Sequence, residues 1–304
     1  MTIKTQRLLA RAKKIAKKGD HKEARKLYKT VLEASPNNQE AKNELLALQQ
    51  VKDHLKPPKA EIQSVFALYS NGQIQEALDA VETLTKDYPN EPLLYNISGV
   101  CYKAIGQLDA AVKSFEKALS IKPDYIEAYY NLGVTLKELG QLDAAVESYK
   151  KALALKPDYT DAHYNLGNAF KELGQLDDAI KSYKKAVVVE PGHANAHNNL
   201  GNALSDLGQL DDAVKSYKKA VAVKPDYAVA HNNLGVTFKD LDQLDAAIKC
   251  YEKALAIKPD YVEAYRNLGN VMKRLKRLDE ALAIYESAIA LDPDLDFILG
   301  DVLH

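Results

Sequence analysis

Three histidines recur at a fixed spacing, and they are the first side chains in this chain that could do chemistry. His163, His197 and His231 follow one another at a 34-residue spacing, and imidazole is a common ligand of zinc. The residue 34 positions before His163 is Tyr129, so the position accepts aromatic rings in general. Equivalent atoms in neighbouring helical repeats lie about 10 Å apart, too far for two imidazoles to share one ion. We therefore expect these rings to pack, and we predict no metal site.

Other signatures of catalysis are missing from the sequence. It contains no phosphate-binding glycine loop, no Cys-x-x-Cys pair and no nucleophile elbow. The recurring Asp-Ala-Ala and Asp-Asp-Ala carboxylates fall where helices are expected to begin, and a structural role is sufficient for them there. We therefore expect no enzymatic activity from this chain and no cofactor.

The two cysteines, Cys101 and Cys250, bear on the compartment in which the protein works. They lie too far apart in a repeat stack to form a disulfide, and free thiols fit a reducing compartment. The N-terminus lacks the continuous apolar core of a secretory signal, and no apolar run approaches the ~20 residues that span a bilayer. We therefore expect a cytoplasmic protein with no membrane span.

Asparagine is the polar residue that recurs most strictly. It precedes a Leu-Gly pair in five successive repeats, as Asn131, Asn165, Asn199, Asn233 and Asn267. The Asn side chain carries both a donor and an acceptor on a short stem. It can therefore bind the N–H and C=O groups of an extended peptide without reading the peptide's side chains.

These asparagines belong to a 34-residue repeat that aligns without gaps from residue 58 to 295. Counting position 1 at Ile126, the apolar or small residues at positions 4, 7, 8 and 11 form one stripe on a helix. Gly140 is expected to end that helix, and Pro157 to end a second one. The sequence therefore predicts hairpins of two helices that bury their apolar faces by stacking on neighbouring hairpins.

Positions 2, 5, 6, 9 and 13 remain for the opposite side of the first helix. Position 9 holds Asn168, Asn202 and Asn270, with Val134 and Val236 in the other two repeats; position 5 begins with Tyr130 and Tyr164; position 13 holds Glu138, Glu172, Asp206, Asp240 and Arg274. Neighbouring helices pack ~8–10 Å apart and an extended chain advances ~3.3 Å per residue, so one Asn per repeat would meet roughly every third peptide residue. The alternative is that Asn at position 6 only caps or hydrates the surface.

The order of small and large residues resembles the tetratricopeptide repeat (TPR) pattern. That pattern has an aromatic at position 4, Leu-Gly at 7–8, Ala at 20, an aromatic at 24 and Pro at 32, as in Tyr129, Leu132, Ala145, Tyr149 and Pro157. The resemblance implies an all-α fold, a right-handed superhelical α-solenoid of stacked two-helix hairpins. It also implies that positions 2, 5, 6, 9 and 13 line a concave groove. In the last two repeats, Asp242 and Lys276 replace the glycine at position 15, so those helix ends lose their glycine cap.

We expect three parts along the chain. Residues 1–57 form a divergent N-terminal repeat plus an extra helix, residues 58–295 form seven consecutive repeats, and residues 296–304 begin a following segment. The segment 1–60 carries 15 Lys and Arg against 6 Asp and Glu. Such a basic cap could contact nucleic acid or an anionic membrane, but no aromatic or glycine-rich nucleic-acid motif accompanies the lysines. A solvated helix surface is our preferred interpretation, with no nucleic-acid partner.

The Asn series, the Ala-Tyr-x-Asn-Leu-Gly openings and the Lys-Pro-Asp-Tyr joints resemble the repeats of bacterial O-linked N-acetylglucosamine transferase-like proteins. Residues 294–304 resemble the segment that leads into their glycosyltransferase domain. This resemblance implies an asparagine ladder that holds substrate polypeptides, and a C-terminal catalytic domain in the full-length chain. A carboxylate clamp for chaperone C-termini is not expected, because no repeat has Lys at position 5.

The sequence thus predicts a non-catalytic interaction module, the substrate-recognition arm of a larger glycosyltransferase, whose partners are extended or disordered polypeptides. The alternative is a self-standing assembly scaffold that self-associates and has no peptide groove.

Overall fold

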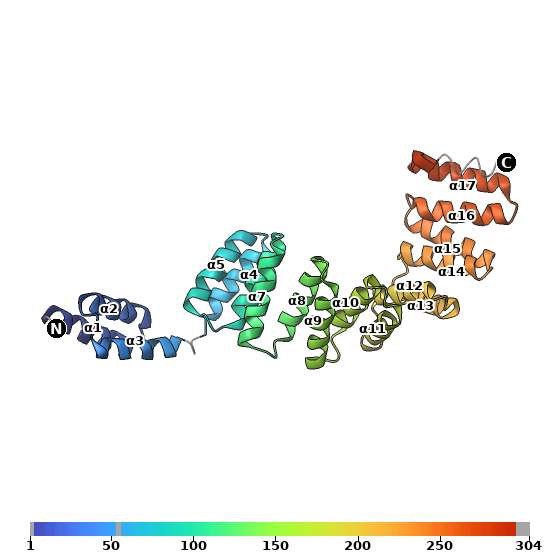
Figure 1. The fold of residues 1–304 in the computed structure, drawn as a ribbon. Helices are drawn as coiled ribbons and strands as arrows, with labels where there is room; N and C mark the ends of the chain where they lie inside the picture. The colour runs from blue at the N-terminus through green and yellow to red at the C-terminus, as the bar shows by residue number, and fades with distance from the viewer. Residues whose placement is uncertain (1–2, 53–55, 296–304) are drawn as a thin grey trace. The chain divides into compact units, whose positions relative to one another are not determined.

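The computed structural model describes residues 3–52 and 56–295 (Figure 1). Within these residues it contains seventeen α-helices and one short 3-10 helix, and no β-strand. Each 34-residue repeat forms one helical hairpin, as the sequence predicts, so the fold is an all-α solenoid of stacked hairpins. In the described part of the chain, no helix is long and apolar enough to cross a membrane.

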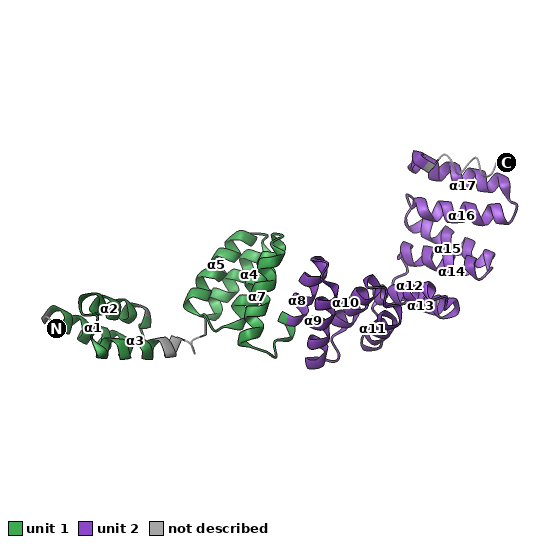
Figure 2. Ribbon diagram, in the orientation of Figure 1, with its two compact units in different colours: residues 1–128 green, residues 129–304 purple. Residues whose placement is uncertain are grey.

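The chain divides into two compact units, residues 1–128 and residues 129–304 (Figure 2). We call them unit 1 and unit 2. The division falls inside a helix of the repeat array. The expected following segment, residues 296–304, lies outside the described residues.

Unit 1 contains two groups of helices, each with its own core. The first is α1 (Ile3–Lys17), α2 (His21–Ala34) and α3 (Gln39–Lys52), which share a core around Ala12, Tyr28 and Leu48. The helix α3 occupies most of the segment that separates the first two repeats. The second group is α4 (Lys59–Ser70), α5 (Ile74–Asp87), α6 (Pro92–Ala104) and α7 (Leu108–Ile121), with Val65 and Leu94 in its core.

Unit 2 is a regular stack of hairpins, in which we call the first helix of each hairpin A and the second B. The A helices are α8 (Ile126–Glu138), α10 (Thr160–Glu172), α12 (Ala194–Asp206), α14 (Ala228–Asp240) and α16 (Val262–Arg274). The B helices are α9 (Leu142–Leu155), α11 (Leu176–Val189), α13 (Leu210–Val223), α15 (Leu244–Ile257) and α17 (Leu278–Leu291). A 3-10 turn, η1 (Pro293–Leu295), follows α17. From α10 to α16, each A helix also contacts the next A helix.

The glycine at position 8 allows the two helices of a hairpin to approach closely. In the α10–α11 hairpin, a Cβ atom on Gly167 would lie 2.6 Å from ring atoms of Tyr183, which is fully buried. The same contact recurs in all five hairpins of unit 2. Any larger residue at this position would collide with the ring. The glycine at position 8 and the tyrosine at position 24 therefore depend on each other for packing.

The A helices end in the same left-handed turn whether or not the residue is glycine. Gly174 has φ +73°, and Asp242 and Lys276 both have φ +60° in its place. The backbone hydrogen bond across this turn is kept, because the N–H of Arg277 donates to the Met272 carbonyl at 3.0 Å. The last two hairpins therefore lose the glycine, as expected, but keep the geometry of the cap at a steric cost.

Candidate functional site

The asparagines predicted from the sequence lie together on the A helices of unit 2. We call positions 5, 6 and 9 of α8, α10, α12, α14 and α16 the asparagine face. The position-6 asparagines are half-buried except Asn267, which is 9% exposed. At position 9, Asn168 and Asn202 are half-buried and Asn270 is exposed. Because A helices contact each other in succession, these side chains form a continuous row.

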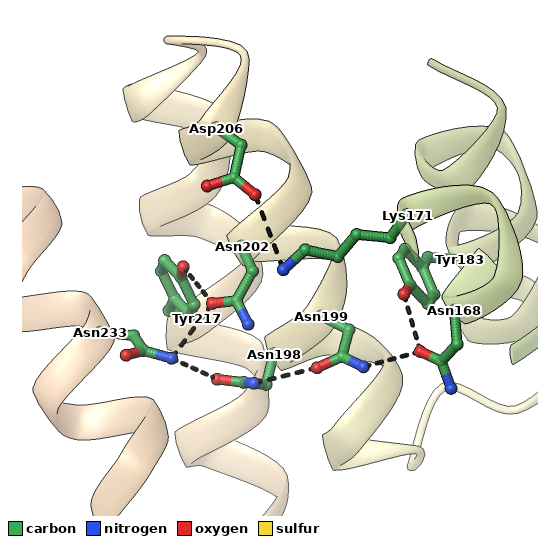
Figure 3. Close-up of polar contacts among 9 residues, drawn as sticks. All are labelled: Asn168, Lys171, Tyr183, Asn198, Asn199, Asn202, Asp206, Tyr217 and Asn233. Carbon is green, nitrogen blue, oxygen red and sulfur yellow. Dashed lines mark hydrogen bonds and ion pairs between the residues drawn. The ribbon is translucent and has the colours of Figure 1, made fainter. Parts of the chain in front are cut away.

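From Asn165 onward, each position-6 amide donates one or two hydrogen bonds to the A helix that precedes it. The Nδ2 of Asn199 donates to the Tyr164 hydroxyl at 3.3 Å and to Asn168 Oδ1 at 3.0 Å. The Nδ2 of Asn233 donates to Asn198 Oδ1 at 3.2 Å and to Asn202 Oδ1 at 3.1 Å (Figure 3). Single bonds of the same kind join Asn165 to Tyr130 at 3.0 Å and Asn267 to Asn232 at 3.1 Å.

Each position-9 asparagine is held from behind by the tyrosine of its own B helix. The hydroxyls of Tyr183, Tyr217 and Tyr285 donate to the Oδ1 atoms of Asn168, Asn202 and Asn270, each at 2.7 Å. Figure 3 shows two of these pairs. The carbonyl oxygens of Asn168 and Asn202 thus accept two hydrogen bonds each, one from the tyrosine and one from the next A helix.

The network decides which atoms stay available on the asparagine face. Among the described residues, the Nδ2 groups of Asn168 and Asn202 have no acceptor, and Figure 3 shows both nitrogens away from the hydrogen bonds. The Oδ1 of Asn233 has no donor within the same residues. The Oδ1 of Asn199, by contrast, accepts from the Nδ2 of Asn198 at 3.2 Å. Position 9 therefore offers donors at Asn168 and Asn202, and position 6 offers an acceptor at Asn233, whereas the sequence suggested that one Asn would supply both.

Aromatic rings continue the face at its N-terminal end. The ring centroids of Tyr130 and Tyr159 are 4.9 Å apart, as are those of Tyr164 and His193. Burial raises the pKa of Tyr130 above its usual value. The hydroxyl of Tyr130 therefore stays protonated at neutral pH. The hydroxyls of Tyr130 and Tyr164 each accept a hydrogen bond from the asparagine at position 6 of the next A helix.

The acidic residues at position 13 form ion pairs between repeats. Lys137 Nζ lies 2.8 Å from Glu172, and Lys171 Nζ lies 3.6 Å from Asp206 (Figure 3). These side chains are partly exposed, so each pair contributes little to stability. Glu172 and Asp206 are thus already paired with lysines of the preceding A helix, whereas Asp240 pairs with Lys239 of its own helix at 3.3 Å.

The recurring histidines pack, as predicted. The Nε2 atoms of His163, His197 and His231 lie 2.8, 3.0 and 3.0 Å from the carbonyl oxygens of Pro157, Pro191 and Pro225. In unit 1 the hydroxyl of Tyr95 donates to the Pro89 carbonyl at 3.0 Å in the same way. Burial lowers the pKa of His197 below the usual histidine value. The described residues contain no group of three or more His, Cys, Asp or Glu placed to hold a metal ion.

The tyrosines at position 24 are the site residues that sequence reasoning missed. The sequence predicts them as core residues, and they are buried. Three of them also orient an asparagine of the face. A signal was available, because every Asn at position 9 lies 15 positions before a tyrosine. Where position 9 is Val134 or Val236, the buried hydroxyls of Tyr149 and Tyr251 have no hydrogen-bond partner.

Several solved structures have a fold similar to that of this chain. MamA shares 30% identity and a TM-score of 0.52, over 54% of this chain and 95% of MamA. YrrB, a TPR protein with an unusual peptide-binding site, shares 24% identity and a TM-score of 0.55, over 62% of this chain and 96% of its own. Part of a TPR protein from Cytophaga hutchinsonii shares 21% identity and a TM-score of 0.68, over 80% of this chain and 99% of its own. A search of curated proteins returned no match.

Family models cover most of the sequence. The TPR repeat model matches residues 99–140, 135–174, 167–208, 201–242 and 237–276. Tetratricopeptide repeat models also match residues 262–295 and 16–38. These matches, together with the hairpin geometry, show that the chain belongs to the tetratricopeptide repeat family.

Proposed function

We propose that this TPR protein-interaction module binds extended polypeptide along the asparagine face of unit 2, through the peptide backbone. The observation that supports the proposal is the set of unpaired groups on that face. Asn168 and Asn202 offer amide donors, and Asn233 offers a carbonyl acceptor. Peptide planes present one acceptor and one donor, so these two kinds of asparagine complement a backbone without reading its side chains.

The hydrogen-bond network prepares the face for this task. Because Asn199 and Asn233 are tied to the preceding A helix, and Asn168 and Asn202 to tyrosines, their rotamers are fixed before a ligand arrives. A fixed side chain loses less conformational entropy on binding than a mobile one. The YrrB structure, which shares the fold, has a peptide-binding site by its own description.

A backbone-modified peptide tests the recognition mode directly. The probe is a labelled 15-residue peptide of Ser and Thr, compared by fluorescence anisotropy with the same peptide carrying N-methyl groups on its central amides. We expect N-methylation to weaken binding about fivefold, because the hydrogen bond from a peptide N–H to the fixed Asn233 carbonyl is worth about 1 kcal/mol. Equal affinity for the two peptides would contradict backbone capture.

The triple variant Asn165→Ala, Asn199→Ala and Asn233→Ala tests the residues. It should abolish binding of the Ser/Thr peptide while circular dichroism shows unchanged helicity. The matched control is Tyr149→Phe with Tyr251→Phe, which removes two buried hydroxyls that make no hydrogen bond to the asparagine face. The control should keep most of the binding. Unchanged affinity in the triple variant would reject the asparagine face as the site.

The larger context is a second part of the proposal. We infer that the module is the substrate-recognition arm of a glycosyltransferase, acting in the cytoplasm with its two free thiols reduced. The support is the resemblance of the Asn series and of residues 294–304, most of which lie outside the described residues. Sequencing the coding region past His304 tests it. A sugar-nucleotide-binding α/β domain would support the arm, and an immediate stop codon would refute it.

An assembly scaffold is the competing function, and one observation favours it. Position 21 is buried in four repeats, where Val146 is 5% and Ile180 is 6% exposed, but Leu282 in α17 is only half-buried. Leu282 and the exposed Leu278, one turn before it on α17, are the apolar surface that a second copy would use. Light scattering over a range of concentrations separates the two functions, since a monomer that binds peptide rules out the scaffold.

A further inference from the structure

Two of the five A helices of unit 2 have an apolar residue at position 9 of the asparagine face. Val134 in α8 and Val236 in α14 occupy position 9, where α10, α12 and α16 carry Asn168, Asn202 and Asn270. Both valines are half-buried. Along the asparagine face, one valine therefore lies on each side of Asn168 in α10 and Asn202 in α12.

The interior of the protein does not favour these valines. Each leaves a fully buried tyrosine hydroxyl, that of Tyr149 or Tyr251, without the acceptor that an asparagine supplies in the other repeats. An unpaired buried hydroxyl destabilises a fold. Unit 1 shows the self-consistent alternative, in which Val100 at position 9 accompanies Phe115, a residue with no hydroxyl, at position 24. The valines of unit 2 thus face a tyrosine whose hydroxyl needs an acceptor such as asparagine, so packing alone does not account for them.

Resting on the proposed function, we propose that Val134 and Val236 are apolar specificity subsites of the asparagine face. The ligand is an extended peptide with two aliphatic side chains that flank a stretch whose backbone is accessible. Three helical repeats at ~8–10 Å each span ~24–30 Å, and an extended chain advances ~3.3 Å per residue, so the two aliphatic residues lie about eight positions apart. Asn168 and Asn202 bind the peptide backbone between the two aliphatic side chains.

Peptides of matched length test the spacing. The probes are labelled 15-residue Ser/Thr peptides with Leu at positions 4 and 12, with Leu at positions 4 and 8, and with no Leu. The first should bind at least about tenfold tighter than the peptide without Leu, because an aliphatic side chain leaves water at each subsite. The second should gain clearly less, because only one of its leucines reaches a valine.

The variant Val134→Asn with Val236→Asn tests the subsites. It should lose the preference for the 4,12-leucine peptide. Its thermal unfolding midpoint should stay equal or rise, because each new asparagine gives Tyr149 or Tyr251 an acceptor. The control, Tyr149→Phe with Tyr251→Phe, removes the unpaired hydroxyls without changing the face, so it should keep the full leucine preference. A change in peptide specificity can then be told apart from a change in stability, because only the Asn variant should alter specificity.

The outcomes distinguish the subsites from the face itself. A leucine preference that survives in the double Asn variant overturns the assignment of Val134 and Val236. If the Ser/Thr peptide binds in an Asn-dependent way but leucine adds nothing, the subsites are refuted and the backbone face stands. If no probe binds the wild-type protein, the proposed function fails together with the subsites.

Discussion

The tyrosine hydroxyl at position 24 differs from repeat to repeat in what it contacts. In α11, α13 and α17 it donates to an asparagine at 2.7 Å, whereas in α9 and α15 it is buried without a partner. The same side chain is therefore stabilising in three hairpins and costly in two. Chemically identical substitutions should give opposite results, depending only on the residue at position 9.

Tyrosine-to-phenylalanine variants measure this difference. Tyr183→Phe should lower the free energy of unfolding by about 1 kcal/mol, because it removes a buried hydrogen bond. Tyr149→Phe should be neutral or stabilising by up to about 1 kcal/mol, because it removes a buried hydroxyl that lacks a partner. Urea titrations of the two variants provide the comparison. Equal destabilisation by both would show that the hydroxyl of Tyr149 is satisfied in solution.

His197 should make stability depend on pH. Burial lowers the pKa of His197 in the folded state, so the unfolded chain binds a proton at a higher pH than the folded protein does. Stability is then present above the unfolded pKa of about 6.5 and declines as pH falls below it. His197→Tyr should remove this pH dependence of stability. Tyrosine fits the position, because Tyr95, the equivalent residue of an earlier repeat, donates its hydroxyl to the Pro89 carbonyl. Thermal unfolding of both proteins between pH 5 and 8 checks it, and parallel curves would contradict it.

At the scale of the helix, the turns at Asp242 and Lys276 are strained, because a non-glycine residue there has a positive φ. Lys276 adopts φ +60°, a conformation that favours glycine. Lys276→Gly should therefore stabilise the protein by about 0.5–1 kcal/mol, measured by denaturant unfolding. Asp242 is a less clean test, because its carboxylate also lies 2.6 Å from Arg274.

The matched control reverses the change at an equivalent turn. Gly208 has φ +73° with no atom near its missing Cβ, so Gly208→Ala should destabilise by about 1 kcal/mol through backbone conformation alone. If Lys276→Gly also destabilises, the gain in unfolded-state entropy outweighs the relief of strain at that turn.

At the scale of the whole molecule, hairpins of unit 2 should be interchangeable. Deletion of residues 194–227 removes one 34-residue repeat and joins α11 to α14 in register. Asn233 would then take the place of Asn199 and donate to Asn168 and Tyr164. We expect a folded helical protein of lower stability, because a repeat array loses one hairpin and one interface.

A deletion out of register provides the contrast. Deletion of residues 194–213 removes α12 and the start of α13, so the rest of α13 loses its partner helix and exposes its apolar stripe. Circular dichroism and urea unfolding should show a cooperative transition for the 34-residue deletion only. Loss of cooperative unfolding in both would mean that the repeats of unit 2 are not equivalent.

The sequence by itself determined the hairpins and their stacking. A period of 34 with Leu-Gly, Ala, Tyr and Pro at fixed positions specifies local helices and contacts between neighbours, and these follow from apolar spacing alone. It also placed Asn165, Asn199 and Asn233 in one row. The packing of His163 followed from its alignment with Tyr129.

Only the tertiary structure decided which atoms of that row are free. The hydrogen bonds of the asparagine face join residues 15, 31 and 35 positions apart, and such pairings depend on the distance between helices, not on spacing within one helix. They turn the Asn199 amide towards the preceding helix and leave the Nδ2 of Asn168 without an acceptor. A repeating sequence gives every asparagine the same status, whereas the contacts between hairpins leave Asn233 at position 6 with a free acceptor and Asn168 and Asn202 at position 9 with free donors.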